Sequence, residues 1–103
     1  MRIDWIPKAL IHLEEIYLFY SHFSETTATK IRQNIIKEVG LLMSFPFLGS
    51  KETTISSEVI LYRSLVILKG RYKIIYHIEK ERIYIYIVWD CRRNPERLLK
   101  ETK

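Results

Sequence analysis

The sequence contains one cysteine, Cys91, so no disulfide can form within the chain and nothing indicates an oxidising compartment. Its three glycines stand far apart, which excludes a glycine-rich phosphate-binding loop. His12, His22 and His77 are too scattered to form a metal-binding motif, and we expect no metal and no cofactor. No apolar run reaches the length of a signal peptide or the roughly 20 residues of a membrane span. We therefore expect a soluble, cytoplasmic protein with no membrane partner.

What the sequence does contain is enough apolar material for one core. Of its 103 residues, 48% are hydrophobic and 28% are charged, which excludes a disordered chain and predicts a single domain over residues 1–103. The formal net charge is +5. A basic surface attracts RNA, DNA, an acidic protein or a membrane headgroup layer, and charge alone does not choose among them.

Helical periodicity dominates the first half of the chain. Apolar residues recur at three- and four-residue steps over residues 8–23, which predicts an amphipathic helix. Ser24 or Thr26 can cap a second helix, which we expect to run to about Phe45, because Pro46 cannot continue it.

Alternation replaces this periodicity in the second half. After a loop over residues 47–57, strands are predicted at residues 58–68, 72–78 and 83–89. A short edge strand is expected at residues 2–6, and Pro95 can open a short terminal helix over residues 96–100.

The element order is therefore β-α-α-β-β-β with a possible short C-terminal helix, which predicts a two-layer α+β fold: a helical hairpin packed on one face of an antiparallel sheet, with the other face partly open. Facing apolar stripes predict one core between these layers. Its expected members are Leu13, Tyr17, Ile31, Ile35, Val39, Ile74, Tyr76, Ile85 and Ile87.

Five segments, taken in order, resemble a known family. They are Phe-Pro-Phe-Leu-Gly at 45–49, Tyr-Arg-Ser-Leu at 62–65, Arg-Tyr-Lys-Ile-Ile-Tyr at 71–76, the strand at 85–89 and Asp-Cys-Arg-Arg-Asn-Pro at 90–95. Over nearly its whole length, the chain resembles the RelE/ParE superfamily of type II toxins.

The resemblance implies a growth-inhibiting toxin that a cognate antitoxin neutralises. RelE-like members cut mRNA on the ribosome, whereas ParE-like members poison DNA gyrase and are not nucleases. A relative that is not toxic and only assembles with its antitoxin in transcriptional autoregulation is the alternative. No Tyr or His follows Arg93, where RelE-like nucleases carry one, so the sequence leaves open whether the chain is an enzyme.

The resemblance also points to particular cations. RelE-like members often carry an Arg at the position of Lys73, and Arg93 matches a second Arg of theirs. Arg63 lies near the family's cationic residues on the first strand after the loop. In catalysis such cations stabilise the extra charge on the phosphate. Arg71 and Arg92 add charge nearby and are candidates for binding a substrate or partner. His77 could act as a base or an acid, although a histidine on a half-exposed sheet face needs no function.

Alternation predicts where these cations meet. Lys73 is out of phase with Tyr72, Ile74 and Tyr76, so it should point away from the helices. We expect Lys73, Arg93 and Arg63 to converge on the open face and to meet acidic residues of the antitoxin there. The pair Arg92-Arg93 either clamps such an anionic group or forms a solvated turn that bridges to Asp90 or Glu96.

Overall fold

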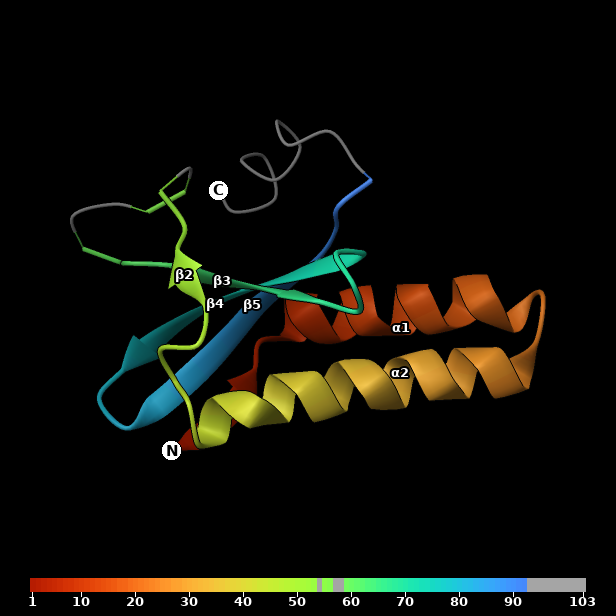
Figure 1. Cartoon of the computed structure of the whole chain (residues 1–103), viewed down its shortest axis with the longest axis horizontal. Helices are drawn as coiled ribbons and strands as arrows, with labels where there is room; N and C mark the ends of the chain where they lie inside the picture. The colour runs from red at the N-terminus through yellow and green to blue at the C-terminus, as the bar shows by residue number, and fades with distance from the viewer. Residues whose placement is uncertain (54, 57–58, 93–103) are drawn as a thin grey trace.

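Two helices lie side by side against one face of a five-stranded sheet (Figure 1). The computed structural model describes residues 1–53, 55–56 and 59–92. In this part of the chain the strand order is β1-β5-β4-β3-β2, with β1 parallel to β5 and the other neighbours antiparallel. The elements are β1 (Arg2–Trp5), α1 (Pro7–Ser21), α2 (Glu25–Gly40), the 3-10 helix η1 (Leu41–Met43), β2 (Ser50–Lys51), β3 (Arg63–Ile67), β4 (Tyr72–Glu79) and β5 (Arg82–Asp90). The predicted two-layer α+β fold is confirmed.

Both helices begin where the sequence favours a helix start. Pro7 is the first residue of α1, a position at which its missing N–H has no intrahelical partner to lose. Ser24 caps α2, because its Oγ accepts a hydrogen bond from the N–H of Thr27 at 3.2 Å. α2 ends at Gly40 instead of near Phe45, because the chain tightens there into the i→i+3 bonds of η1.

The sheet differs from its prediction mainly at its β2 edge. β3 covers Arg63–Ile67 instead of residues 58–68, and residues 59–62 belong to the preceding loop. The strand β2 lies within the segment predicted as a loop and pairs with β3. The sequence does not predict it, because a strand of two residues has no periodicity. The predicted helix at residues 96–100 lies outside the described residues.

The main core lies between the helices and the sheet. Most predicted members are buried there, namely Leu13, Ile35, Val39, Ile74, Tyr76 and Ile85. Ile31 packs against this cluster and is partly buried. Tyr17 is also only half-buried, and its ring carries the guanidinium of Arg32 at 4.1 Å.

The prediction that Ile87 joins the main core is wrong, because the β4–β5 ladder contains an irregularity. Ile75 pairs with Ile87 but the next residue, Tyr76, pairs with Ile85, so Tyr86 is an extra residue in β5. Alternation therefore reverses at this point, and Val88 faces the helices. Ile87 joins a second cluster with Ile75 and Trp89.

Candidate functional site

The predicted functional side chains do not form one cluster. Arg93 lies outside the described residues, and the other five fall in four places. Lys73 and His77 lie at two positions on the sheet face away from the helices, and Arg63 lies on the opposite face. Arg71 and Arg92 lie together beside α1.

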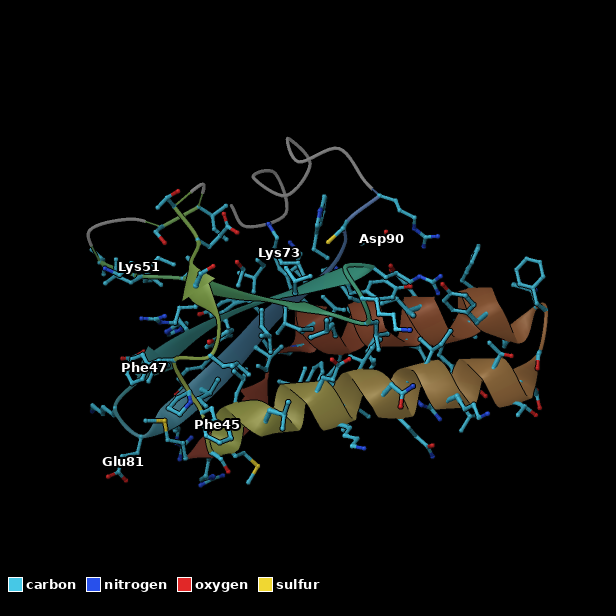
Figure 2. All side chains as sticks on the ribbon, in the orientation of Figure 1. Phe45, Phe47, Lys51, Lys73, Glu81 and Asp90 are labelled. Atoms are coloured by element: carbon cyan, nitrogen blue, oxygen red, sulfur yellow. The ribbon has the colours of Figure 1, made fainter. Side chains whose placement is uncertain are left out.

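Lys73 points away from the helices, as its alternation predicted (Figure 2). Its Nζ lies 3.1 Å from Oε2 of Glu52, whose side chain is only 10% exposed. The charge of Lys73 is therefore matched within the chain, in a partly buried ion pair.

The loop before β3 covers the part of this face around Lys73. Ile55 and Tyr62 pack against the second cluster of buried residues, Ile75, Ile87 and Trp89. The hydroxyl of Ser56 donates a hydrogen bond to the carbonyl of Glu52 and accepts one from the N–H of Tyr62 at 3.0 Å. The face is therefore less open than the sequence predicted.

Arg63 lies on the helix-facing side of the sheet, at its edge. The strand register pairs it with Tyr76 and puts it in phase with Leu65 and Ile67, whereas Val66 shares the face of Lys73. Its Nη1 donates a hydrogen bond to the carbonyl of Gly49 at 2.7 Å, and its guanidinium lies 4.9 Å from the ring centre of Phe47. The predicted convergence of Arg63 with Lys73 is wrong, because the two side chains leave the sheet on opposite faces.

His77 is enclosed by tyrosine rings. It stacks on Tyr84 with 5.1 Å between ring centres, and Tyr62 meets it edge-on at 5.9 Å. Its Nε2 lies 3.2 Å from the hydroxyl of Tyr86. Burial lowers the pKa of His77, and Glu79 only partly opposes this shift. The imidazole is thus buried and favours its neutral form, whereas the sequence predicted a half-exposed histidine.

Arg71 and Arg92 meet around two tyrosine hydroxyls. Nη1 of Arg71 donates to the hydroxyl of Tyr20 at 3.0 Å, and the hydroxyl of Tyr72 donates to the same oxygen at 3.4 Å. Nε and Nη2 of Arg92 bind the two carboxylate oxygens of Asp90 at 2.9 and 2.8 Å, which raises the pKa of Arg92. The predicted bridge to Asp90 is confirmed.

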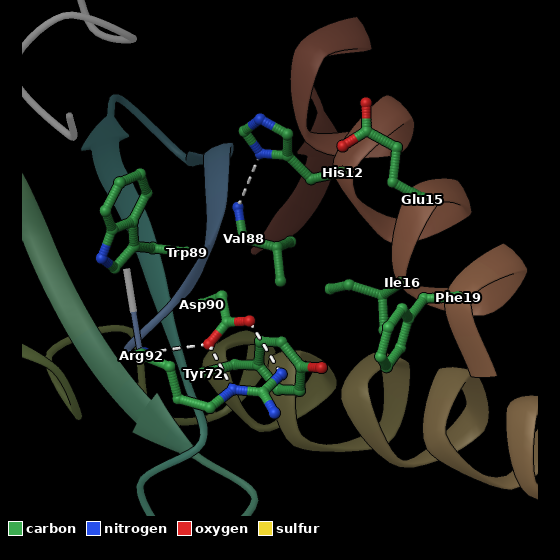
Figure 3. Close-up of a pocket in the computed structure, with 9 residues that line it drawn as sticks. All are labelled: His12, Glu15, Ile16, Phe19, Tyr72, Val88, Trp89, Asp90 and Arg92. Atoms are coloured by element: carbon green, nitrogen blue, oxygen red, sulfur yellow. Dashed lines mark hydrogen bonds and ion pairs between the residues drawn. The ribbon is translucent and has the colours of Figure 1, made fainter. Parts of the chain in front are cut away.

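A pocket of about 240 Å³ opens beside this cluster (Figure 3). It exists because β1 pairs with β5 only as far as Ile85, after which Pro7 turns the chain into α1. Beyond Ile85 along β5, the N–H of Val88 donates a hydrogen bond to Nδ1 of His12 in α1 at 3.2 Å. The lining residues are His12, Glu15, Ile16, Phe19, Tyr72, Val88, Trp89, Asp90 and Arg92.

This pocket can hold an apolar side chain. Ile16, Phe19 and Val88 supply apolar contacts. The charged lining residues are Arg92, which Asp90 binds through Nε and Nη2, and the carboxylates of Asp90 and Glu15. Arg71 lies outside this lining and binds Tyr20. Its volume is below the range of pockets that enclose whole drug-sized ligands, so an anchoring side chain of a protein fits it better.

The sequence indicates Arg71 and Arg92 but gives no sign of the residues that complete the site. His12 and Tyr20 looked like ordinary positions on an amphipathic helix, and no local pattern shows that they meet strands 50 or more residues later. Glu52 was assigned to a loop, where a single acidic residue carries no signal. In the described part of the chain, no group of three metal-ligating side chains gathers, and no helix is long and apolar enough to cross a membrane.

Comparison with known proteins identifies the family. No curated protein matches the chain. Among solved structures, it is similar to a chain of the chromosomal ParDE TA system from P. aeruginosa, with a TM-score of 0.72 and 24% identity over 87% of this chain and 95% of that chain. That similarity shows the fold. A family model described as the ParE toxin of the type II toxin–antitoxin system parDE matches residues 3–95, and the chain therefore belongs to the ParE toxin family.

Proposed function

We propose that this chain inhibits growth by poisoning DNA gyrase, that it does not cut mRNA, and that a cognate antitoxin neutralises it. The observation that carries the choice of target is the position of the cations. Arg63 and Lys73, which the resemblance to RelE-like nucleases marks as catalytic, lie on opposite faces of the sheet. Each is bound to an oxygen of the chain itself, Arg63 to the Gly49 carbonyl and Lys73 to Glu52.

The chemistry of RNA cleavage explains why this arrangement matters. The reaction needs a base for the 2′-hydroxyl, an acid for the leaving oxygen, and cations around the phosphate. Lys73 is neutralised by Glu52, and the Nε2 of His77 is engaged by Tyr86. In this proposal these side chains hold the loop against the sheet, and Arg93 is a candidate for binding a partner.

The target is tested by expressing the chain under a controlled promoter. We expect loss of viability, double-strand breaks trapped on gyrase, and intact mRNA. Breaks confined to translated mRNA would replace the proposal with a ribosome-dependent nuclease. Unimpaired growth together with antitoxin binding would replace it with the non-toxic relative.

A paired substitution makes the same test residue-specific. Glu52→Gln with Lys73→Met removes both charges of the ion pair and leaves no unmatched charge behind. We expect this variant to stay toxic if it folds, whereas a nuclease that uses Lys73 would lose its activity. Arg93→Ala is compared with this double variant, because a nuclease that uses Arg93 would also lose mRNA cleavage when Arg93 is replaced.

The antitoxin part of the proposal rests on the pocket. The basic net charge of +5 and the Arg71 guanidinium beside Tyr20 should speed the encounter with an acidic segment, while the apolar pocket anchors the complex. Arg71→Glu should therefore lower the association rate by about tenfold or more at low salt, and added salt should reduce that difference. Lys30→Glu, an exposed change on α2, is the control. Equal association rates for the two variants would contradict this role of Arg71.

A further inference from the structure

The turn between β3 and β4 has a backbone that its own residues disfavour. Leu68 and Lys69 have φ angles of 48° and 55°, in the left-handed region. The N–H of Gly70 donates to the carbonyl of Ile67 at 3.2 Å and closes the turn around them. Two positive φ angles inside such a bond are typical of a type I′ turn, where Asn and Gly are the favoured residues. Leucine and lysine are strained there because their Cβ atoms crowd the backbone, so contacts outside the turn must hold its conformation.

Glu38 of α2 makes such a contact. Its Oε2 accepts a hydrogen bond from the N–H of Leu68 at 3.1 Å, and the side chain of Leu68 packs against the main core. Lys69, the second strained residue, is exposed. Glu38 lies in the last turn of α2, where a negative charge is disfavoured because the carbonyl ends of the helix dipoles are already negative. The helix itself therefore gains nothing from this carboxylate, whereas the turn gains a charged acceptor.

The turn sets the position of Arg71, which follows it directly. The N–H of Arg71 donates to the carbonyl of Leu68 at 3.2 Å, and the carbonyl of Arg71 accepts from the N–H of Cys91 at 3.0 Å. Nη1 of the same residue donates to the hydroxyl of Tyr20 at 3.0 Å. The side chain of Arg71 is thus held by α1, while α2 holds the turn before it through Glu38.

We propose that Glu38 is a positioning residue for Arg71: its carboxylate keeps the β3–β4 turn left-handed and so fixes where the Arg71 guanidinium meets a partner. The part that concerns the partner rests on the proposed function, in which Arg71 speeds the encounter with an acidic segment. A cation held in one place binds with a smaller loss of entropy than a mobile one.

The sign of the charge separates positioning from simple electrostatics. Glu38 is negative in a chain whose formal net charge is +5. Its removal should by itself speed association with an acidic segment, because the basic chain becomes more basic. Loss of positioning should slow the same association. The two effects therefore have opposite directions in one variant.

The first measurement is amide hydrogen exchange, followed by NMR on the full chain. Glu38→Ala should speed exchange of the Arg71 and Cys91 N–H groups by about tenfold or more and leave the rest of β5 unchanged. Glu38→Gln keeps an oxygen that can accept the Leu68 N–H, so it should stay within about threefold of the wild-type chain. Adding Lys69→Gly to Glu38→Ala should restore protection, because glycine adopts a positive φ without strain.

The second measurement is the association rate with the antitoxin encoded beside the toxin gene, at low salt. Glu38→Ala should slow association by about threefold, although it removes a negative charge. The matched control is Glu81→Ala, which removes an exposed carboxylate from the turn between β4 and β5, at the other end of β4. This control should leave the rate unchanged or raise it slightly.

Each other outcome has a distinct meaning. Unchanged exchange at Arg71 and Cys91 in Glu38→Ala overturns the proposal, and so does protection that Lys69→Gly does not restore. Faster exchange throughout the sheet would show that Glu38 stabilises the whole fold and not this turn. A local change in exchange with equal association rates for Glu38→Ala and Glu81→Ala would overturn the part that concerns the partner. If the wild-type chain does not bind the antitoxin, the proposed function fails, and the exchange measurement still decides the role of Glu38.

Discussion

The two faces of the sheet are covered in different ways. On one face α1 and α2 bury a continuous apolar cluster that includes Ile35, Ile74 and Ile85. On the other, the loop before β3 covers only Ile75, Ile87 and Trp89. The three buried polar or charged residues of the described chain are Glu52, Ser64 and His77, and all belong to this second face. The helix-covered face therefore supplies most of the hydrophobic stabilisation, while the loop-covered face contains groups that respond to charge and pH.

The largest expected difference between the faces comes from two neighbouring isoleucines of β5. Ile85 and Ile87 are both fully buried, but they lie on opposite faces. Ile85→Ala should lower the free energy of unfolding by about 2–5 kcal/mol, because the helices packed against this face cannot close the cavity. Ile87→Ala should cost less, because a loop can move into the space. Urea unfolding of both variants measures the difference.

Ile35→Ala is the control from the helix side of the same core, and it should behave like Ile85→Ala. Equal losses for Ile85→Ala and Ile87→Ala would mean that the loop is as rigid as the helices. The contrast between the faces would then have to be abandoned.

The helix-covered face could be predicted from the sequence because the spacing of its apolar residues is visible within each element. Leu13, Ile35 and Val39 repeat with the helical period, and Ile74 and Tyr76 repeat with the strand period. The error at Ile87 came from the extra residue Tyr86 in β5, which shifts the alternation without leaving any mark in residue type. Ladder irregularities of this kind depend on both strands, so one strand read alone does not reveal them.

The candidate site was predictable only in part, for the same reason. Arg71 and Arg92 stand out as cations at strand ends, and the structure brings them together. The partners that give them a role, Tyr20 from α1 and Tyr72 from β4, become neighbours only through the packing of helix on sheet. The pairing of Lys73 with Glu52 likewise depends on a loop path that no period predicts.

Gly49 stands where the chain passes between the two faces, and the next largest effect is expected there. A Cβ at this position would lie 2.6 Å from the carbonyl oxygen of Ser64 and 2.7 Å from the hydroxyl of Tyr76. Gly49→Ala should therefore lower the free energy of unfolding by about 1–3 kcal/mol, because backbone must shift. Gly40→Ala is the matched control, since a Cβ there meets nothing within 4 Å, and it should stabilise α2 by about 0.5–1 kcal/mol. Thermal unfolding that ranks the two variants in the opposite order would contradict this account of the loop.

Substitutions in the ion pair of Lys73 and Glu52 test whether charge holds the loop before β3 against the sheet. Glu52→Ala should lower the free energy of unfolding by about 1–2 kcal/mol, because Lys73 loses its partner but can regain water from its exposed side. Glu52→Met with Lys73→Met should lie closer to the wild-type chain, because no unmatched charge remains. If the double variant is less stable than Glu52→Ala, apolar replacement does not compensate and the loop is held by other contacts.

The smallest expected effect is a pH dependence from His77. Burial lowers the pKa of its imidazole below the usual 6.5, with Glu79 acting in the opposite direction. The unfolded chain then binds the proton at a higher pH than the folded chain does, so it carries more protons between the two pKa values. The contribution of neutral His77 should be fully present above pH 6.5 and should be lost as the pH falls from there toward the folded pKa. Urea unfolding between pH 8 and pH 5 should therefore show the wild-type chain losing stability relative to His77→Phe, which keeps the ring but cannot be protonated. If the difference in stability between the wild-type chain and His77→Phe stays constant across this pH range, the tyrosines around His77 tolerate its charged form. The two faces would then differ in their packing but not in their response to pH.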